Sequence, residues 1–297
     1  MRLDRRWMPP NGRHAQRVRR TLTIQLEAAR PLRGQSRLYT EGRTIIPTRP
    51  MTSPTEAQRL AVREWPADSP VMYQRWLDLL FLHWEYSPEE IQATLPEGLF
   101  VDTFGGKAYL GIVPFFMRNV RPRFLPGVPG LSHFMELNLR TYVHDRAGVP
   151  GVWFYSLDAN QRLAVAIARR FFHLPYEHAR MKAARVDGGG IRYESVRVGA
   201  GGGSVFQYAP GDPLPSSAVD SLTFFLIERY RLYAASGSRL WRGAVSHQPY
   251  ALTEVILSVW DEQIIALSGL RVAGREPDHA VMSSGVEVSI FPLKRVC

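Results

Sequence analysis

Between residues 99 and 158 the chain passes through four successive segments rich in aromatic and β-branched residues, and no other feature restricts its fold as much. These segments read LFVDTF, KAYLGIVPFF, FMELNLRTYV and GVWFYSLD. Glycine or proline lies at their boundaries, as is typical of strands. Three more segments of this kind, HARMKAARV, GIRYESVRVG and GSVFQYAPG, follow further along. The sequence therefore predicts an α+β fold with a predominantly antiparallel sheet or barrel and two or three helices.

Two stretches predict long helices between the strands. Residues 158–172 have capping-box spacing at their start, with Asp158 as the cap. Three apolar residues recur in this stretch every four positions, namely Leu163, Ile167 and Phe171. Residues 221–237 predict the second helix. Arg169, near the end of the first helix, suits the negative pole of the helix dipole and is also placed to reach a bound anion.

The positive charge of the chain lies almost entirely near its N-terminus. Residues 1–50 hold twelve Arg, no Lys and three acidic residues, a balance of +9, whereas the remainder holds 25 basic and 24 acidic residues. We predict that residues 1–65 form a basic, disordered extension and residues 66–297 a single domain. Three alternatives for the extension are a basic arm for nucleic acid or anionic lipid, a targeting sequence, and an early start codon ahead of Met51. Because the predicted domain is nearly neutral, we do not expect nucleic acid among its partners.

Several classes of protein and site are disfavoured by what the sequence lacks. Cys297 is the only cysteine, so an intrachain disulfide is impossible and we expect a cytoplasmic protein. No apolar run approaches the roughly 18 residues of a membrane helix, so we expect no membrane partner. The sequence contains neither HExxH nor GxSxG, and the glycine-rich GAGGGS leads into a predicted strand rather than a helix. We therefore expect no metal and no organic cofactor.

The segment FMELNLRTYV carries the candidate site. In a strand, alternate residues face opposite sides, so Glu136, Asn138 and Arg140 share one face. If that face lines a cavity, Arg140 would bind a ligand carboxylate with two N–H groups, Glu136 would transfer protons, and Asn138 would supply a hydrogen bond. The alternative is an ordinary antiparallel strand whose polar face lies in water.

Several blocks of sequence, taken in order, resemble one family. They read LFLHWEYSPEEIQATLPEGLFVDTFGGKAYLGIVPF, ELNLRTYV, PGVWFYSLDA, PYEHARM, LIERYRLY and SSGVEVSIF, and they extend from about Trp76 to Phe291. In this order they resemble the YqjF-like uncharacterised proteins, also called domain of unknown function 2071. The resemblance covers essentially the whole predicted domain and leaves out the first fifty residues.

This resemblance implies an acetoacetate decarboxylase-like fold, in which a strongly bent antiparallel sheet closes like a cone around a small-molecule cavity. In that wider superfamily a lysine forms a Schiff base with a β-keto acid. The stretch ARRFFHLPYEHARM resembles the lysine-bearing segment, and Tyr176 occupies the place just after its proline. The three lysines of the chain, Lys107, Lys182 and Lys294, lie elsewhere, so we expect no Schiff base. Tyr176 would instead donate a hydrogen bond to a carbonyl oxygen, act as an acid if its pKa falls, or pack at the end of the sheet.

Two functions from different classes follow from this reasoning. The first is a pocket for a small organic acid or carbonyl compound, with Glu136 and Tyr176 as catalytic residues and Arg140, Asn138 and Arg169 as binding residues. The second is a non-catalytic ligand-binding or scaffold protein of the same fold, which the missing lysine favours. Whether the chain is an enzyme stays open, and a homo-oligomer is compatible with both functions.

Overall fold

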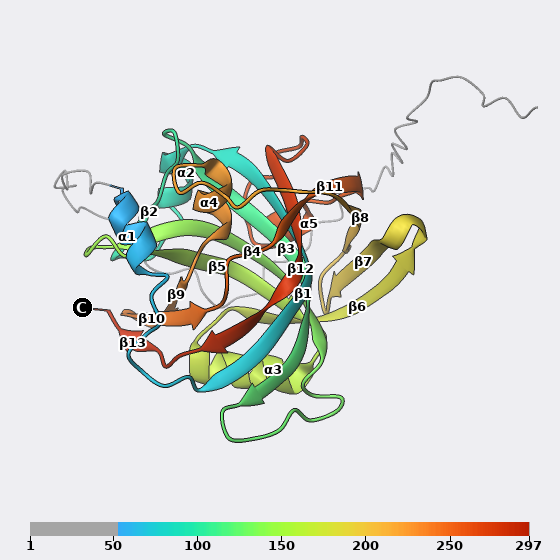
Figure 1. Cartoon of the computed structure of the whole chain (residues 1–297), viewed down its shortest axis with the longest axis horizontal. Coiled ribbons are helices and arrows are strands. Elements are labelled where there is room, and N and C mark those ends of the chain that lie inside the picture. Colours follow the sequence, from blue (N-terminus) through green and yellow to red (C-terminus); the bar gives the residue numbers. More distant parts are fainter. Residues whose placement is uncertain (1–52, 297) are drawn as a thin grey trace, which may run out of the picture. The chain divides into compact units, whose positions relative to one another are not determined.

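The structure, a computed structural model, describes residues 53–296, and strands dominate its regular structure (Figure 1). Residues 1–52 of the predicted extension lie outside the described residues. The strands are β1 (Met72–Tyr86), β2 (Leu99–Val101), β3 (Ala108–Pro122), β4 (Phe134–Asp145), β5 (Pro150–Ala159), β6 (Tyr176–Val186), β7 (Gly190–Arg197), β8 (Ser204–Pro213), β9 (Arg231–Ser236), β10 (Arg239–Ser246), β11 (Leu252–Val259), β12 (His279–Ile290) and β13 (Lys294–Arg295).

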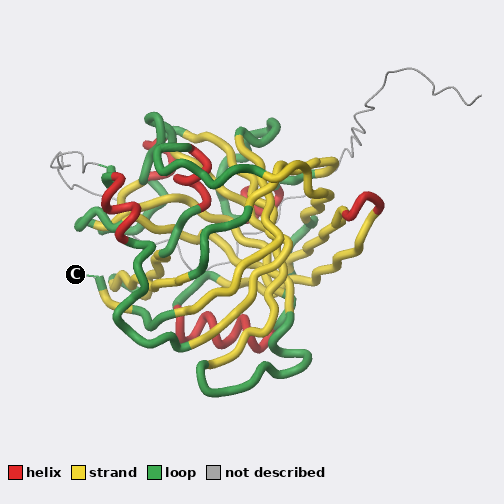
Figure 2. The backbone as a smooth tube through the Cα atoms, viewed as in Figure 1, coloured by secondary structure: helices red, strands yellow, loops and turns green. Residues whose placement is uncertain are grey.

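The helices are few and short (Figure 2). They are α1 (Glu56–Ala61), α2 (Pro88–Gln92), α3 (Arg162–Ile167), α4 (Leu222–Ile227) and α5 (Gln263–Leu267), with a π-helical turn at Ala168–Phe172 and a 3₁₀ turn at Asp187–Gly189. Among residues 53–296 no helix is long and apolar enough to cross a membrane.

All thirteen strands belong to one strongly curved sheet, in the order β13-β10-β9-β5-β6-β7-β8-β11-β12-β1-β3-β4-β2. Two additional pairings join strands that are far apart in this order: β4 also pairs with β5, and β12 also pairs with β10. Most neighbours are antiparallel, as predicted. The exception is β5, which is antiparallel to β4 but parallel to both β6 and β9.

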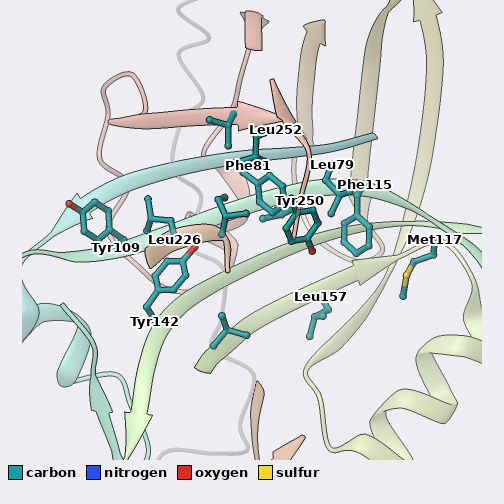
Figure 3. Packing of buried hydrophobic residues seen from close by; sticks show 14 of the residues in the cluster. Leu79, Phe81, Tyr109, Phe115, Met117, Tyr142, Leu157, Leu226, Tyr250 and Leu252 are labelled. Atoms are coloured by element: carbon teal, nitrogen blue, oxygen red, sulfur yellow. The ribbon is translucent and has the colours of Figure 1, made fainter. Parts of the chain in front are cut away.

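Strand β4 lies between two clusters of buried apolar residues. Phe134 and Tyr142 belong to the first cluster, and Met135, Leu137 and Leu139 belong to the second. We call the first one the interior cluster; Figure 3 labels ten of its members, namely Leu79, Phe81, Tyr109, Phe115, Met117, Tyr142, Leu157, Leu226, Tyr250 and Leu252. The curvature of the sheet thus covers both faces of β4, and its even-numbered residues point toward the interior cluster.

The predicted helix at residues 158–172 is shorter than expected and begins later. Asp158 is the penultimate residue of β5, and Gln161 caps α3 by accepting a hydrogen bond from the Leu163 N–H. Asp158 stays in the strand because its buried carboxylate pairs with Arg197 at 2.7 Å. The apolar residues that recur every four positions do not face the core, because Leu163, Ile167 and Phe171 are exposed. The buried residue of α3 is Val165 instead.

The predicted helix at residues 221–237 is also wrong beyond its first half. Helix α4 ends at Ile227, and the chain then continues as β9. Four consecutive residues of α4, from Phe224 to Ile227, are buried, so the segment has no solvent-facing side along which a longer helix could continue. The backbone of β9 finds its hydrogen-bond partners in β10 and β5 instead.

Regular structure is present in residues 53–65, which belong to the predicted extension. Helix α1 lies within the predicted extension, and Thr55 caps it through a complete capping box. Arg59 of this helix donates two hydrogen bonds of 2.6 Å to the buried carboxylate of Asp102. The division of the chain into residues 1–65 and 66–297 otherwise stays a prediction.

Candidate functional site

The face of β4 that carries Glu136, Asn138 and Arg140 is buried rather than solvated. Glu136 is 3% exposed and Asn138 is 5% exposed, while Arg140 is half-buried. The alternative of a polar face in water is therefore wrong, because the curved sheet covers this face with the interior cluster. That these residues line an enclosed cavity stays a prediction.

Glu136 and Tyr176 meet in the interior although they lie forty residues apart. The Tyr176 hydroxyl donates a hydrogen bond of 2.7 Å to Glu136 Oε2, and both side chains are buried. Strand pairing explains the contact: Glu136 lies opposite Ala159 in β5, and Leu157 of β5 lies opposite Tyr176 at the start of β6. Two of the predicted catalytic residues are thus in direct contact.

The environment of this pair favours a protonatable carboxyl and a neutral phenol. Burial raises the pKa of Glu136 to about 7, although hydrogen bonds from Tyr176 and Asn138 partly oppose that rise. Burial, followed by the proximity of Glu136, raises the pKa of Tyr176 well above its ordinary value. The predicted option that Tyr176 acts as an acid through a lowered pKa is therefore wrong. A pKa near 7 suits Glu136 to accept or donate a proton at neutral pH.

Asn138 and Arg140 each have a buried polar atom without a partner. Arg140 Nη2 donates to the Leu226 carbonyl oxygen at 3.3 Å, and its guanidinium lies 5.5 Å from the Phe81 ring centre. Among the described residues, Arg140 Nε and Asn138 Oδ1 have no hydrogen-bond partner, and both are shielded from solvent. A buried donor or acceptor left unsatisfied costs about 1–3 kcal/mol, so such atoms are typical of places where a ligand or water completes the bonding.

Arg169 does not join the other predicted site residues. Its Nε donates to the backbone carbonyl of Tyr176, and its Nη2 pairs with Glu177 at 2.7 Å on the protein surface. The side chain lines a hollow of about 500 Å³ whose lining includes none of Glu136, Asn138 and Arg140. Tyr176 connects this hollow with the interior site, because its backbone carbonyl contacts Arg169 while its hydroxyl contacts Glu136.

The three lysines lie at the surface. Lys107 and Lys294 are more than half exposed, and Lys182 is exposed on β6, paired in register with Glu194. None of the hydrogen bonds or ion pairs that we find among residues 53–296 connects a lysine to Glu136 or Arg140.

A buried histidine chain next to Arg140 was missed by the sequence reasoning. His83 Nε2 lies 2.7 Å from the Tyr142 hydroxyl, and His83 Nδ1 lies 3.0 Å from His279 Nδ1. His279 Nε2 lies 3.1 Å from the Thr223 hydroxyl. Burial lowers the pKa of His83 well below its ordinary value and that of His279 to about 4, so both rings are neutral at pH 7. No local signal indicates this contact, because the pairing of β1 with β12 joins residues 196 positions apart.

Comparison with known sequences gives a clear family match. The family DUF2071, described as an uncharacterized conserved protein, matches residues 73–287. Uncharacterized protein YqjF of Bacillus subtilis (strain 168) is 38% identical over 208 residues, which cover 70% of this chain and 85% of that protein.

Solved structures of similar fold include acetoacetate decarboxylases and an enzyme of enduracididine biosynthesis. An acetoacetate decarboxylase-like enzyme from Sphingomonas wittichii RW1 matches with a TM-score of 0.51 at 14% identity, covering 77% of this chain and 94% of that one. The acetoacetate decarboxylase of Legionella pneumophila matches with a TM-score of 0.53 at 12% identity, covering 79% and 91%. The enduracididine biosynthesis enzyme MppR, complexed with pyruvate, matches with a TM-score of 0.52 at 12% identity, covering 78% and 93%. At these identities the likeness shows the fold, which is the fold that the sequence resemblance implied.

Proposed function

The chain belongs to the DUF2071 family of uncharacterised conserved proteins, and from this premise we propose that its interior site binds a small organic acid or carbonyl compound. One observation carries the proposal: a buried donor, Arg140 Nε, and a buried acceptor, Asn138 Oδ1, have no partner among residues 53–296, and both lie on the strand face that also presents Glu136. A guanidinium recognises a carboxylate through its N–H groups, and the Nε–H of Arg140 has no partner among the described residues.

Each residue of the site has a role in this proposal. Arg140 binds the anionic group of the ligand, and Asn138 Oδ1 accepts a hydrogen bond from a donor group elsewhere on the ligand. Glu136 accepts or donates a proton, since burial brings its pKa to about 7. Tyr176 orients Glu136 through the hydrogen bond of 2.7 Å. Arg169 contributes only indirectly, through the Tyr176 carbonyl.

The proposed chemistry proceeds without a Schiff base. An imine requires a lysine amine at the reacting carbon, and the three lysines are at the surface. Proton transfer at a carbon next to a carbonyl group remains within reach of a carboxyl with a pKa near 7. The pyruvate complex of MppR, a neighbour in fold, supports a small keto acid as the first ligand class to test.

Three further properties belong to the same proposal. The curved sheet closes as a cone-like barrel around the site, which the two additional strand pairings support. The domain acts in the cytoplasm, and a single cysteine at the C-terminus is consistent with a reducing compartment. Nucleic acid and membranes are not partners of the domain, and it assembles as a monomer or homo-oligomer.

A thermal-shift experiment on the full chain tests the ligand class. Pyruvate, acetoacetate and lactate are added to the parent protein, to Arg140→Ala, to Arg140→Lys and to Arg185→Ala, which alters an exposed arginine elsewhere. A ligand at a hundred times its Kd stabilises by about 2.7 kcal/mol, so we expect a clear rise in Tm for the parent and Arg185→Ala. The rise should vanish in Arg140→Ala and shrink in Arg140→Lys, which keeps the charge but loses the fork of N–H groups. An equal rise in all four proteins contradicts the proposed role of Arg140.

A second candidate function is a non-catalytic binding protein, which the missing lysine favours. Incubation of a bound keto acid in deuterated water separates the two, because proton transfer at carbon exchanges hydrogen for deuterium. An enzyme should incorporate deuterium faster than the buffer does, and Glu136→Gln should abolish the difference. Binding without any acceleration of exchange or turnover supports the non-catalytic protein.

A further inference from the structure

Strand β5 is the branch point of the sheet. Along one edge it pairs in parallel with β9 at Val152 and Trp153 and with β6 from Leu157 to Ala159. Residues 154–156 of that edge pair with neither strand, because β9 and β6 diverge there. Backbone N–H and C=O groups of a strand edge are strong hydrogen-bonding groups and need partners when they are shielded from water.

The hollow of about 500 Å³ lies at this divergence, and we call it the fork pocket. Its lining comes from β5 (Trp153, Phe154, Tyr155), β9 (Tyr233, Ala234, Ala235), the segment before β6 (His173, Leu174, Pro175), Arg169 and Thr94. Its volume falls within the range of about 300–1,000 Å³ that is usual for pockets that hold small molecules. None of the interior residues Glu136, Asn138 and Arg140 belongs to this lining, so the fork pocket is a separate place.

The lining has a distinct chemical character. Four of its residues are aromatic and none carries a carboxylate; Trp153 and Tyr155 share one face of β5, whereas Phe154 packs against the interior cluster. Arg169 and His173 are its basic side chains. The aromatic residues offer flat apolar surface for a planar group, and Arg169 offers a charged donor for an anion.

Arg169 is available for such an anion. Its Nε and Nη2 are used by the Tyr176 carbonyl and by Glu177, whereas no hydrogen bond to a described residue uses its Nη1. The pair with Glu177 is about half exposed on both sides. An exposed ion pair contributes little to stability, so a ligand carboxylate can compete with it.

We infer that the fork pocket is a second binding site, which takes a carboxylate carried on an aromatic body. The aromatic ring lies between the side chains of β5 and those of β9, and the carboxylate faces Arg169. Apart from the contact of Arg169 with the Tyr176 carbonyl, this site is independent of the proposed function of the interior.

Calorimetric titration of the full chain with three matched probes tests this inference. The probes are 3-phenylpropanoate, 3-phenylpropan-1-amine, which has the same ring with the opposite charge, and propanoate, which has the acid without the ring. We expect 3-phenylpropanoate to bind and the other two to bind at least about tenfold more weakly, because each lacks one of the two recognised groups.

Four variants locate the site. Ala235→Trp fills the hollow from a partly exposed position and should abolish binding of 3-phenylpropanoate. Arg169→Gln should weaken it about tenfold or more, as expected for the loss of a charge-assisted hydrogen bond. Arg185→Gln and Arg140→Ala, which alter a remote surface arginine and the interior site, should leave binding unchanged.

Three results would overturn the inference. One is the absence of heat from 3-phenylpropanoate up to about 10 mM. Another is parent-like affinity in Arg169→Gln, which decides the matter even if Ala235→Trp does not fold. The third is loss of binding in Arg140→Ala alone, which would place the ligand in the interior site instead.

Discussion

Replacing Glu136 with glutamine is expected to stabilise the protein at neutral pH and to have little effect in acid. Burial raises the pKa of the Glu136 carboxyl from its ordinary 4.5 to about 7, and at about 1.4 kcal/mol for each pKa unit this corresponds to about 3 kcal/mol. Glutamine keeps an oxygen that accepts from Tyr176, and its amide can donate to Asn138 Oδ1, which has no partner among the described residues. The substitution therefore removes the buried charge, keeps the hydrogen bond from Tyr176, and replaces the one from Asn138 with one to the Asn138 oxygen.

The direction of the pH dependence follows from which state holds the proton. Between pH 4.5 and about 7 the unfolded chain has lost the Glu136 proton while the folded protein still binds it. The contribution of Glu136 to stability therefore falls as pH rises through this window. It is close to zero below pH 4.5, and it reaches its full penalty of about 3 kcal/mol above pH 7.

Urea unfolding from pH 4 to pH 8 measures this contribution. The free energy of unfolding of Glu136→Gln minus that of the parent should rise by about 3 kcal/mol across this range. Glu97→Gln, which changes a carboxylate that is 92% exposed, serves as the matched control and should show no such rise. If the difference for Glu136→Gln stays within about 0.5 kcal/mol at every pH, the buried, high-pKa carboxyl is refuted.

Two further substitutions test how the fold holds its charges and its turns. Asp102→Asn should lower the free energy of unfolding by about 3–5 kcal/mol, because Arg59 and Arg229 lose the buried carboxylate that they share; a loss below about 1 kcal/mol in urea unfolding contradicts this. Gly285→Ala should cost at least about 2 kcal/mol, because φ is +138° and the added Cβ would lie 2.2 Å from the Trp76 carbonyl oxygen; a parent-like urea midpoint would contradict the strain.

The strands were predictable because their signal is local. Alternation of residues from 134 to 143, together with the glycines and prolines between segments, is visible in any short window of the sequence. Strands are present in all seven segments for which the sequence predicts them, although β2 covers only the first three residues of LFVDTF. The family resemblance was equally readable, because several blocks keep their order along the chain.

The two long helices were not predictable from the same windows. Residues 221–237 are predicted as one helix, yet their second half forms β9, which pairs with β10 directly after it and with β5, which is remote in sequence. Asp158 has the spacing of a helix cap, yet its carboxylate is held by Arg197 from β7. In both cases a partner from elsewhere in the fold satisfies the polar groups that a longer helix would have satisfied. Local helix propensity is too weak to oppose such a partner.

For the site, the sequence by itself determined which residues share a face of the strand. The tertiary structure decided whether that face is buried and which residues it contacts. A period of two puts Glu136, Asn138 and Arg140 together whether the strand is buried or wet. Only the curvature of the sheet buries them, and only the parallel pairing of β5 with β6 brings Tyr176 to Glu136. Burial then raises the Glu136 pKa, because loss of water penalises the charged form. The burial of Glu136 depends on the tertiary fold and is not visible in the local sequence.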